Sequence, residues 1–287
     1  TASATVTVTA LPTASISGST TICSGSTAVI SFTGTANAVV TYTVDSGANQ
    51  TITLDATGNA SVTTPALTAN STYTLVSVTA TTTPACTNTA SGSAVVTVLP
   101  LPTAAISGAT TICSGATAVV SFTGTPNATI TYTVDGGANQ TILLDATGNA
   151  SVTTPVLTAN STYNLVSVAS ATTPVCNNTA SGSVTITVNA LPTANVTANT
   201  ICSGTTGTVS FTGTPNAVVT YTVDGGANQT ITLDASGNAS VTTPVLTVNS
   251  TYALVSVTTT ATPICSQAQT ASATVTVTAL PTASISG

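Results

Sequence analysis

Apolar and polar residues alternate at every second position in many short stretches of the chain. Thr5–Thr9 reads Thr-Val-Thr-Val-Thr, and Thr51–Leu54 reads Thr-Ile-Thr-Leu. A period of two predicts β-strands that are buried on one face, whereas an amphipathic helix needs a period of about 3.6. Val, Ile and Thr, which suit a pleated surface, dominate these stretches. The pattern therefore predicts an all-β protein without helices.

Turn residues separate these stretches at strand-length intervals. Asp45–Asn49 and Asp55–Asn59 combine Asp, Gly and Asn, which favour turns. Before residue 100, extended runs are expected at Thr13–Ser17, Thr27–Thr33, Val39–Val44, Thr51–Leu54, Ala60–Thr63, Tyr73–Thr79 and Ala94–Val98. Seven short antiparallel strands within about 90 residues are typical of an immunoglobulin-like or fibronectin III-like β-sandwich.

The same pattern occurs three times along the chain. The pentapeptide Thr-Tyr-Thr-Val-Asp ends at Asp45, Asp135 and Asp224, at spacings of 90 and 89 residues, and the one-residue difference falls shortly before Cys202. Residues 1–18 and 270–287 are identical. Self-similarity at a fixed period predicts a tandem array, and we expect the chain to be an internal fragment of a longer one.

Leu-Pro pairs mark the expected boundaries between repeats, because Pro cannot donate to a β-ladder and favours an extended residue before it. We expect the last strand of a preceding repeat at 1–9, immunoglobulin-like repeats at 10–99, 100–189 and 190–279, and the first strand of a following repeat at 280–287. The linkers are short, so neighbouring repeats should form a semi-rigid rod.

The composition excludes most chemistry. The 287 residues include six acidic side chains and no Lys, Arg or His, which gives a net charge of -6. General acid–base catalysis at neutral pH depends mainly on His, Lys or a tuned carboxyl group. Nucleic acids and anionic membrane surfaces are bound through cationic side chains. We therefore expect no enzyme, no cofactor and no nucleic-acid partner.

No stretch of the chain approaches the roughly 20 apolar residues that span a bilayer. The apolar residues come in short groups such as Ala28-Val29-Ile30, interrupted by Thr and Ser. We expect no membrane insertion, although the mean hydropathy is positive, at +0.49.

The six cysteines fall into three equally spaced pairs. Each pair is separated by 63 residues: Cys23 and Cys86, Cys113 and Cys176, and Cys202 and Cys265. We predict one disulfide within each repeat, closing one end of the sandwich. Metal binding is the alternative use of cysteine, but two thiols without His fall short of a tetrahedral site. Disulfides indicate an oxidising, extracellular compartment.

A tyrosine follows a leucine at the same distance in each repeat. Tyr73 lies six positions after Leu67, and the spacing is the same before Tyr163 and Tyr252. This resembles the tyrosine corner of β-sandwiches, in which the hydroxyl bonds an upstream backbone group. The alternative is a tyrosine that only packs in the core.

The six aspartates lie in predicted turns and have two competing interpretations. They are Asp45, Asp55, Asp135, Asp145, Asp224 and Asp234. Calcium sites need six to eight oxygen ligands, of which two Asp in separate turns supply too few. We expect turn-forming side-chain hydrogen bonds and no metal site.

Four motifs of the first repeat resemble the repeats of giant surface proteins of Flavobacterium and its relatives. They are Thr21-Ile-Cys-Ser-Gly25, Ser31-Phe-Thr-Gly-Thr35, Thr41-Tyr-Thr-Val-Asp45 and Asn70-Ser-Thr-Tyr-Thr-Leu-Val-Ser-Val78. The chain is most similar to the SprB-type gliding adhesins in this group. The resemblance implies export by type IX secretion, display at the bacterial cell surface and movement by the gliding machinery. It also implies the secretion or gliding machinery and external surfaces or polysaccharide as partners, besides neighbouring repeats.

The sequence is compatible with three functions of different classes. A stalk of a surface adhesin fits a rod of β-sandwiches that offers trypsin-like proteases no Lys or Arg. A subunit that assembles head to tail by strand exchange fits the identical ends. A carbohydrate- or ice-binding module would need exposed aromatic rings or flat Thr-x-Thr ladders, and alternation places most aromatic residues in the core. We favour the stalk.

Overall fold

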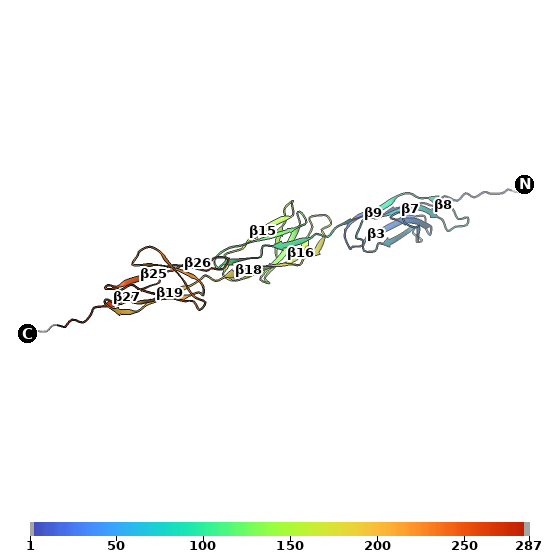
Figure 1. The fold of residues 1–287 in the computed structure, drawn as a ribbon. Coiled ribbons are helices and arrows are strands. Elements are labelled where there is room, and N and C mark those ends of the chain that lie inside the picture. The colour runs from blue at the N-terminus through green and yellow to red at the C-terminus, as the bar shows by residue number, and fades with distance from the viewer. Residues whose placement is uncertain (1–2, 284–287) are drawn as a thin grey trace, which may run out of the picture.

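The computed structural model describes residues 3–283 and shows three β-sandwiches arranged end to end in an elongated molecule (Figure 1). The first and last sandwiches lie at opposite ends of the molecule. The described residues contain 27 strands and no helix. The predicted all-β class, with immunoglobulin-like sandwiches repeated about every 90 residues, is confirmed.

Each sandwich consists of nine strands with closely similar bounds. The first has β1 (Ala14–Ser17), β2 (Thr20–Cys23), β3 (Val29–Gly34), β4 (Val39–Val44), β5 (Gln50–Thr53), β6 (Asn59–Thr63), β7 (Ser71–Thr79), β8 (Thr87–Thr89) and β9 (Ser93–Leu99). The second has β10 (Ala104–Ser107), β11 (Thr110–Cys113), β12 (Val119–Gly124), β13 (Thr129–Val134), β14 (Gln140–Leu143), β15 (Asn149–Thr153), β16 (Ser161–Ala169), β17 (Asn177–Thr179) and β18 (Ser183–Asn189). The third has β19 (Ala194–Ala198), β20 (Thr200–Cys202), β21 (Thr208–Gly213), β22 (Val218–Val223), β23 (Gln229–Thr232), β24 (Asn238–Thr242), β25 (Ser250–Thr258), β26 (Ser266–Ala268) and β27 (Ser272–Thr278).

Two sheets face each other in each sandwich. In the first, one sheet has the order β1-β3-β6 and the other the order β2-β9-β7-β4-β5, with β8 paired to the end of β7. The pair β2 and β9 is parallel, so the expectation of purely antiparallel pairing is wrong at this edge. Strands β1 and β2 are consecutive parts of one extended segment that crosses from one sheet to the other.

Alternate side chains of the strands fill the space between the two sheets. Ile30, Phe32 and Val40 of β3 and β4 are fully buried, and Tyr42 and Tyr73 are 4% exposed. The Phe32 and Tyr42 ring centroids lie 4.9 Å apart, and those of Tyr42 and Tyr73 lie 6.2 Å apart. The other two sandwiches contain the same aromatic cluster, so each repeat has a core of its own.

The N-terminal segment is extended but belongs to no sheet. Residues 3–13 form no strand, and Val6 and Val8 are 86% and 87% exposed. The identical sequence at 272–278 forms β27, in which Val275 is fully buried. The expected strands at 1–9 and 280–287 lie partly outside the described residues, which lack 1–2 and 284–287, and residues 3–9 and 280–283 are in no strand.

Candidate functional site: the junctions between repeats

The first cysteine of each repeat lies at the end of the sandwich that faces the following repeat. Cys23 is the last residue of β2 and lies opposite Leu99, the last residue of β9. The backbone N–H of Ser24 donates to the Leu99 carbonyl at 2.8 Å. Since the linker begins directly after Leu99, Cys23 lies beside the chain that leaves the sandwich. We call Cys23, Cys113 and Cys202 the first cysteines.

The second cysteine of each repeat lies at the opposite end of the sandwich. Cys86 directly precedes β8, which pairs with the last residues of β7. Strand β7 runs antiparallel to β9, so its last residues lie at the end where the chain enters the sandwich. The side-chain amide of Asn88 donates to the Pro12 carbonyl of the entering chain at 3.0 Å. We call Cys86, Cys176 and Cys265 the second cysteines.

Two disulfides join neighbouring sandwiches. Cys23 bonds Cys176, with the Cα atoms 5.5 Å apart, and Cys113 bonds Cys265, with the Cα atoms 5.6 Å apart. Each bond therefore links the first cysteine of one repeat to the second cysteine of the next. The predicted pairs within repeats, Cys23 with Cys86 and its two equivalents, are wrong, because the two cysteines of a repeat lie at opposite ends of the sandwich.

Two of the six predicted disulfide cysteines are free in the structure. They are Cys86 of the first repeat and Cys202 of the last. Cys176 and Cys265, the bonded equivalents of Cys86, are 0% and 1% exposed, whereas Cys86 is half-buried. Cys202 is exposed, whereas the bonded Cys23 and Cys113 are half-buried. The free cysteines therefore differ from the bonded ones mainly in lacking a neighbouring repeat.

The linker crosses each junction beside the disulfide. Pro102 is buried, and its carbonyl accepts the side-chain amide of Asn178, two residues after the disulfide-bonded Cys176, at 3.0 Å. Leu101 in the first junction is 38% exposed, whereas Leu11 and Leu280 at the open ends are 60% and 61% exposed. Each junction therefore has two covalent connections, the linker and the disulfide.

The three corner tyrosines pack in the cores. Tyr73, Tyr163 and Tyr252 are at most 4% exposed. No hydrogen bond from their hydroxyls to an upstream backbone group is found within residues 3–283, so the contact that defines a tyrosine corner is missing. Burial raises the pKa of each of these phenols. The structure supports the alternative interpretation, a core tyrosine.

An aspartate holds the start of the long strand that precedes the second cysteine. Asp45 has a positive φ of 51°. Its Oδ1 accepts the backbone N–H of Thr72 at 2.7 Å, and its Oδ2 accepts the Ser71 hydroxyl at 3.0 Å. Asp135 and Asp224 make the same two contacts. The sequence predicts local turn bonds for these residues and misses their role in connecting β4 to β7.

Asp145 and its equivalents make the expected local turn bonds. Asp145 Oδ1 accepts the Thr147 N–H at 2.8 Å, the Thr147 hydroxyl at 2.7 Å and the Asn149 N–H at 3.0 Å. These bonds, with the Thr147 hydroxyl contributing most, lower the pKa of Asp145 below its ordinary value. The pKa of Asp55 is lowered by the equivalent hydrogen bonds from Thr57 and Asn59, with the Asn59 N–H contributing most. Asp234 accepts the N–H groups of Ser236 and Asn238.

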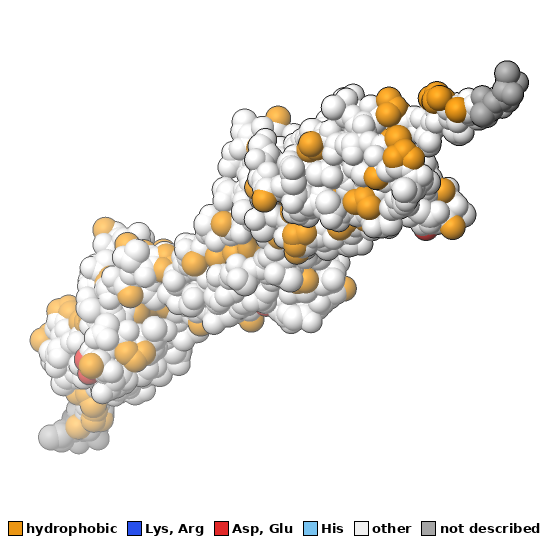
Figure 2. Space-filling view, turned by 90° about the vertical axis from the view of Figure 1, so that its right-hand side faces the viewer, with side chains coloured by type: hydrophobic (Ala, Val, Ile, Leu, Met, Phe, Trp, Pro, Cys, Tyr) orange, Lys and Arg blue, Asp and Glu red, His pale blue; other side chains and the backbone are white. Residues whose placement is uncertain are grey.

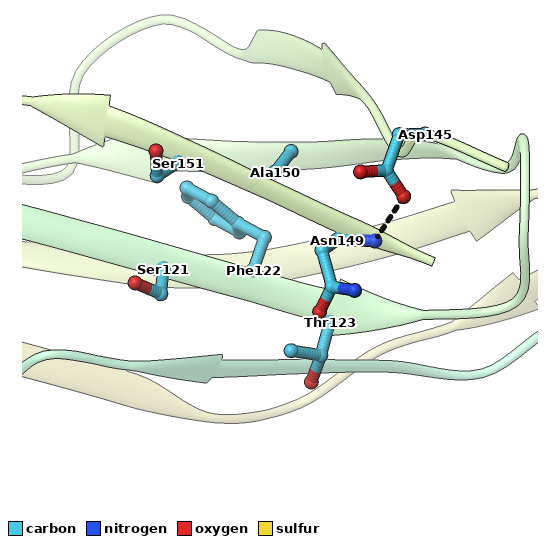
Figure 3. Close-up of a pocket in the computed structure, with 7 residues that line it drawn as sticks. All are labelled: Ser121, Phe122, Thr123, Asp145, Asn149, Ala150 and Ser151. Carbon is cyan, nitrogen blue, oxygen red and sulfur yellow. Dashed lines mark hydrogen bonds between the residues drawn. The ribbon is translucent and has the colours of Figure 1, made fainter. Parts of the chain in front are cut away.

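The lining of the hollow beside Asp145 has no free charged group (Figure 3). It has a volume of about 320 Å³, and hollows of about 290 Å³ occupy the same place in the other two repeats. Its lining residues are Ser121, Phe122, Thr123, Asp145, Asn149, Ala150 and Ser151. The carboxylate, the one charged group there, is already bonded to its own turn. Within residues 3–283 no group of three or more His, Cys, Asp or Glu is arranged to hold a metal ion.

The surface consists mostly of Ser, Thr and other uncharged side chains. Figure 2 shows scattered apolar side chains and few acidic ones on one face of the molecule. All nine aromatic side chains are at most 4% exposed, so none of them forms a platform for stacking on a sugar ring. The described part of the chain has no helix that is long and apolar enough to cross a membrane.

No family model matches the chain. No curated protein matches it. Among solved structures, it is similar to an ICAM-5 D1–D4 ectodomain fragment, with a TM-score of 0.40, 11% identity, and coverage of 93% of this chain and 77% of that chain. A marsupial T cell receptor has a TM-score of 0.40 at 10% identity, covering 89% of this chain and 99% of that chain.

An α-2-macroglobulin from Escherichia coli also matches, with a TM-score of 0.26, 10% identity, and coverage of 93% of this chain and 24% of that chain. The chain thus spans about a quarter of the length of that protein. The class of the protein follows from its own strands and sheets: it is a tandem array of immunoglobulin-like β-sandwiches with disulfides.

Proposed function

We propose that the chain is a structural stalk segment of a long extracellular surface adhesin and has no enzymatic activity. The observation that carries this proposal is the pair of disulfides that join successive sandwiches end to end. A bond across a junction limits bending and separation of neighbouring repeats. A stalk needs this property, because it has to hold a distal binding site away from the cell.

The surface supports the same function. The chain has no Lys or Arg, so trypsin-like proteases find no preferred site along the rod. The six carboxylates are divided equally among the three repeats and give a weak negative charge, which opposes self-association. Disulfides persist in oxidising compartments, which fits a location outside the cell.

The resemblance to SprB-type adhesins supports a more specific version of this proposal. In that version the protein is exported by type IX secretion, displayed on a bacterial cell surface and used in gliding or attachment. Its partners would then be the secretion or gliding machinery and an external surface or polysaccharide.

The experiment is to label the repeats with an antibody on intact source cells and to delete whole repeats from the gene. Surface labelling and a reach that shortens with each deleted repeat are expected; label found only after lysis would refute the proposal.

A head-to-tail filament subunit is the second candidate. The observation in its favour is the free segment Ser3–Thr9, whose sequence is identical to that of β27 in the third sandwich. Such a segment could replace β27 of another copy by strand exchange. The mass of the unreduced protein from source cells, measured in denaturant, separates the two. A chain of several hundred kDa supports the stalk, and a 27.6 kDa chain that associates only without denaturant supports the filament.

A further inference from the structure

The two free cysteines occupy the same positions as bonded ones. Cys86 is equivalent to Cys176 and Cys265, which both bond a first cysteine of the preceding repeat. Cys202 is equivalent to Cys23 and Cys113, which both bond a second cysteine of the following repeat. The two junctions therefore follow one rule: a first cysteine bonds the second cysteine of the following repeat. Cys86 and Cys202 are the two cysteines whose partners under this rule are not among the described residues.

The loop that carries Cys86 shares the backbone hydrogen bond that closes the bonded loops. The Ala80 N–H donates to the Cys86 carbonyl at 2.9 Å. In the bonded loops, Ser170 and Thr259 donate to the carbonyls of Cys176 and Cys265 at 2.9 and 2.8 Å. The loop thus keeps its closing bond whether or not its cysteine is paired.

The turn that carries Cys202 also shares a backbone hydrogen bond with the bonded turns. The Ser203 N–H donates to the Thr278 carbonyl at 2.9 Å, as Ser24 and Ser114 donate to Leu99 and Asn189 at 2.8 Å. Cys86 directly precedes β8, and Cys202 ends β20, which pairs with β27. Strands β8 and β27 lie at opposite ends of the three-sandwich rod, so the two cysteines do not reach each other within one molecule (Figure 1). A partner for either has to come from a further repeat.

We propose that Cys86 and Cys202 are cross-linking sites for further repeats of the same kind. Cys202 bonds the second cysteine of the repeat that docks at the C-terminal end of the rod, and Cys86 bonds the first cysteine of the repeat at the N-terminal end. The partner repeat is supplied by the same chain, where the chain continues, or by a second copy. This inference rests on the proposed stalk for its biological meaning, but its chemistry is tested separately.

Bond formation is an ordinary thiol–disulfide exchange. The thiolate of Cys202 attacks a small-molecule disulfide such as oxidised glutathione, forming a mixed disulfide and releasing one thiolate. The thiolate of the second cysteine then attacks the Cys202 sulfur and releases the second thiolate. Two protein thiols are oxidised to one disulfide, the glutathione disulfide is reduced to two thiols, and the two protein protons end on the released thiolates.

Completed in this way, the array contains two continuous covalent paths along its length. One path runs from Cys23 through its disulfide to Cys176, along the chain to Cys202, and into the following repeat. The stretch from Cys176 to Cys202 consists of β17, β18, the linker, β19 and β20, so most of its residues are in extended strands. The second path runs through Cys86, Cys113 and Cys265 in the same manner.

At each junction one path crosses as the peptide linker and the other as the disulfide. The first junction has the linker of the Cys86–Cys113 stretch and the Cys23–Cys176 bond, and the second junction exchanges these roles. The remaining strands of each sandwich, β3 to β7 and their equivalents, belong to neither path. Tension along the array is therefore carried by extended segments and disulfides.

The experiment uses two variants of the full chain, Cys86→Ser and Cys202→Ser, incubated alone and mixed in a glutathione redox buffer. Each variant retains one free cysteine, Cys202 in the first and Cys86 in the second. The proposal expects each variant to remain monomeric alone and the mixture to form a heterodimer, with a Cys202–Cys86 peptide found after non-reducing digestion. The double variant is the control for dimers that do not depend on these cysteines.

Random oxidation of accessible thiols gives a different result. Homodimers in the separate variants, in amounts equal to the heterodimer in the mixture, would overturn the proposal, as would monomers in all samples. Non-reducing peptide maps of the chain from source cells distinguish the two sources of the partner. A second cysteine from a sequence that follows residue 287 indicates the same chain, and Cys86 itself indicates a second copy. If the mixing test fails while surface labelling succeeds, the cross-link is refuted and the stalk is retained.

Discussion

Cys23 and Cys176 are separated by 153 residues in the chain, yet their Cα atoms lie 5.5 Å apart across the first junction. The contact depends on both sandwiches being folded, because each cysteine is held by hydrogen bonds of its own repeat. Closing a ring of this size stabilises the folded state by about 5 kcal/mol in chain-entropy arithmetic. The unfolding of one repeat is thus coupled to that of its neighbour.

Removing one junction disulfide should destabilise the array and loosen one junction. We expect Cys176→Ser to lower the free energy of unfolding by about 2–5 kcal/mol, measured by denaturant titration. Small-angle scattering should show a wider distribution of lengths. Cys202→Ser is the matched control, since it removes a cysteine that is free in this chain. Equal stability of the two variants would contradict the bond between repeats.

The two disulfides should shorten the length to which the chain can be pulled from its two ends. With both disulfides formed, the shortest covalent route from Cys23 to Cys265 passes through Cys176 and Cys113, which are 63 residues apart. Its extended length is about 220 Å, against about 850 Å for the reduced chain. Single-molecule force spectroscopy with and without reductant measures the difference. Equal lengths with and without reductant would show that the disulfides do not form, whereas cysteines paired within repeats would give a similar oxidised length, about 190 Å over 53 residues.

Asp45 should matter for stability although it is exposed. Replacement by Ala removes both acceptors of the Ser71 and Thr72 contacts and places Ala at a φ of 51°, which costs about 1–2 kcal/mol in total. Asp45→Asn keeps one acceptor and tolerates the positive φ, so a smaller loss is expected. Thermal melting of both variants gives the comparison. An Ala variant as stable as the unmodified protein would show that the contacts to β7 contribute nothing.

Acid should weaken the turns that contain Asp55 and Asp145. Their pKa values are lowered from 3.8 in the folded state, because hydrogen bonds stabilise the charged carboxylates. This contribution is fully present above the unfolded pKa and is lost as the pH falls through the lower folded pKa. Denaturation midpoints measured downward from pH 6 should decline below about pH 4. The decline should be smaller in a variant with Asn at both positions.

High pH should lower the stability of the folded protein by ionising the buried tyrosines. Burial raises the pKa of Tyr42 and Tyr132 above 10.0, because the folded core disfavours the phenolate. Their stabilising contribution is fully present below the unfolded pKa and is lost as the pH rises through the folded one. Phenolate absorbance should therefore appear at higher pH in the folded protein than in denaturant. Coincident titration curves would show that the rings are accessible to water.

The sequence predicts the strands that alternate clearly and misses two that do not. Val39–Val44 is predicted with the bounds of β4, and Tyr73–Thr79 covers most of β7. Thr20–Cys23 and Thr87–Thr89 have only four and three residues and lie beside Gly- or Pro-containing turns. They form strands because β9 and β7 provide partners, which is tertiary information that a local pattern does not contain.

The cysteine pairing could not be decided by spacing. Both pairings are regular in a tandem repeat: each first cysteine lies 63 residues before the second cysteine of its own repeat, and Cys23 and Cys113 lie 153 and 152 residues before that of the next. The strand directions contain the missing signal. Cys23 follows a strand that runs parallel to the last strand of the repeat, and Cys86 follows β7, which runs antiparallel to it. The two cysteines of one repeat therefore lie at opposite ends, where only a neighbour provides a partner.

The overlap of the two disulfide rings also determines how the rod responds to damage. One ring closes at Cys23 and Cys176 and the other at Cys113 and Cys265, so every peptide bond from Cys23 to Cys265 lies inside at least one ring. A protease that cuts any single bond in this region, including either linker, leaves both fragments covalently attached. The array thus tolerates one backbone break anywhere between Cys23 and Cys265 without separating into two pieces.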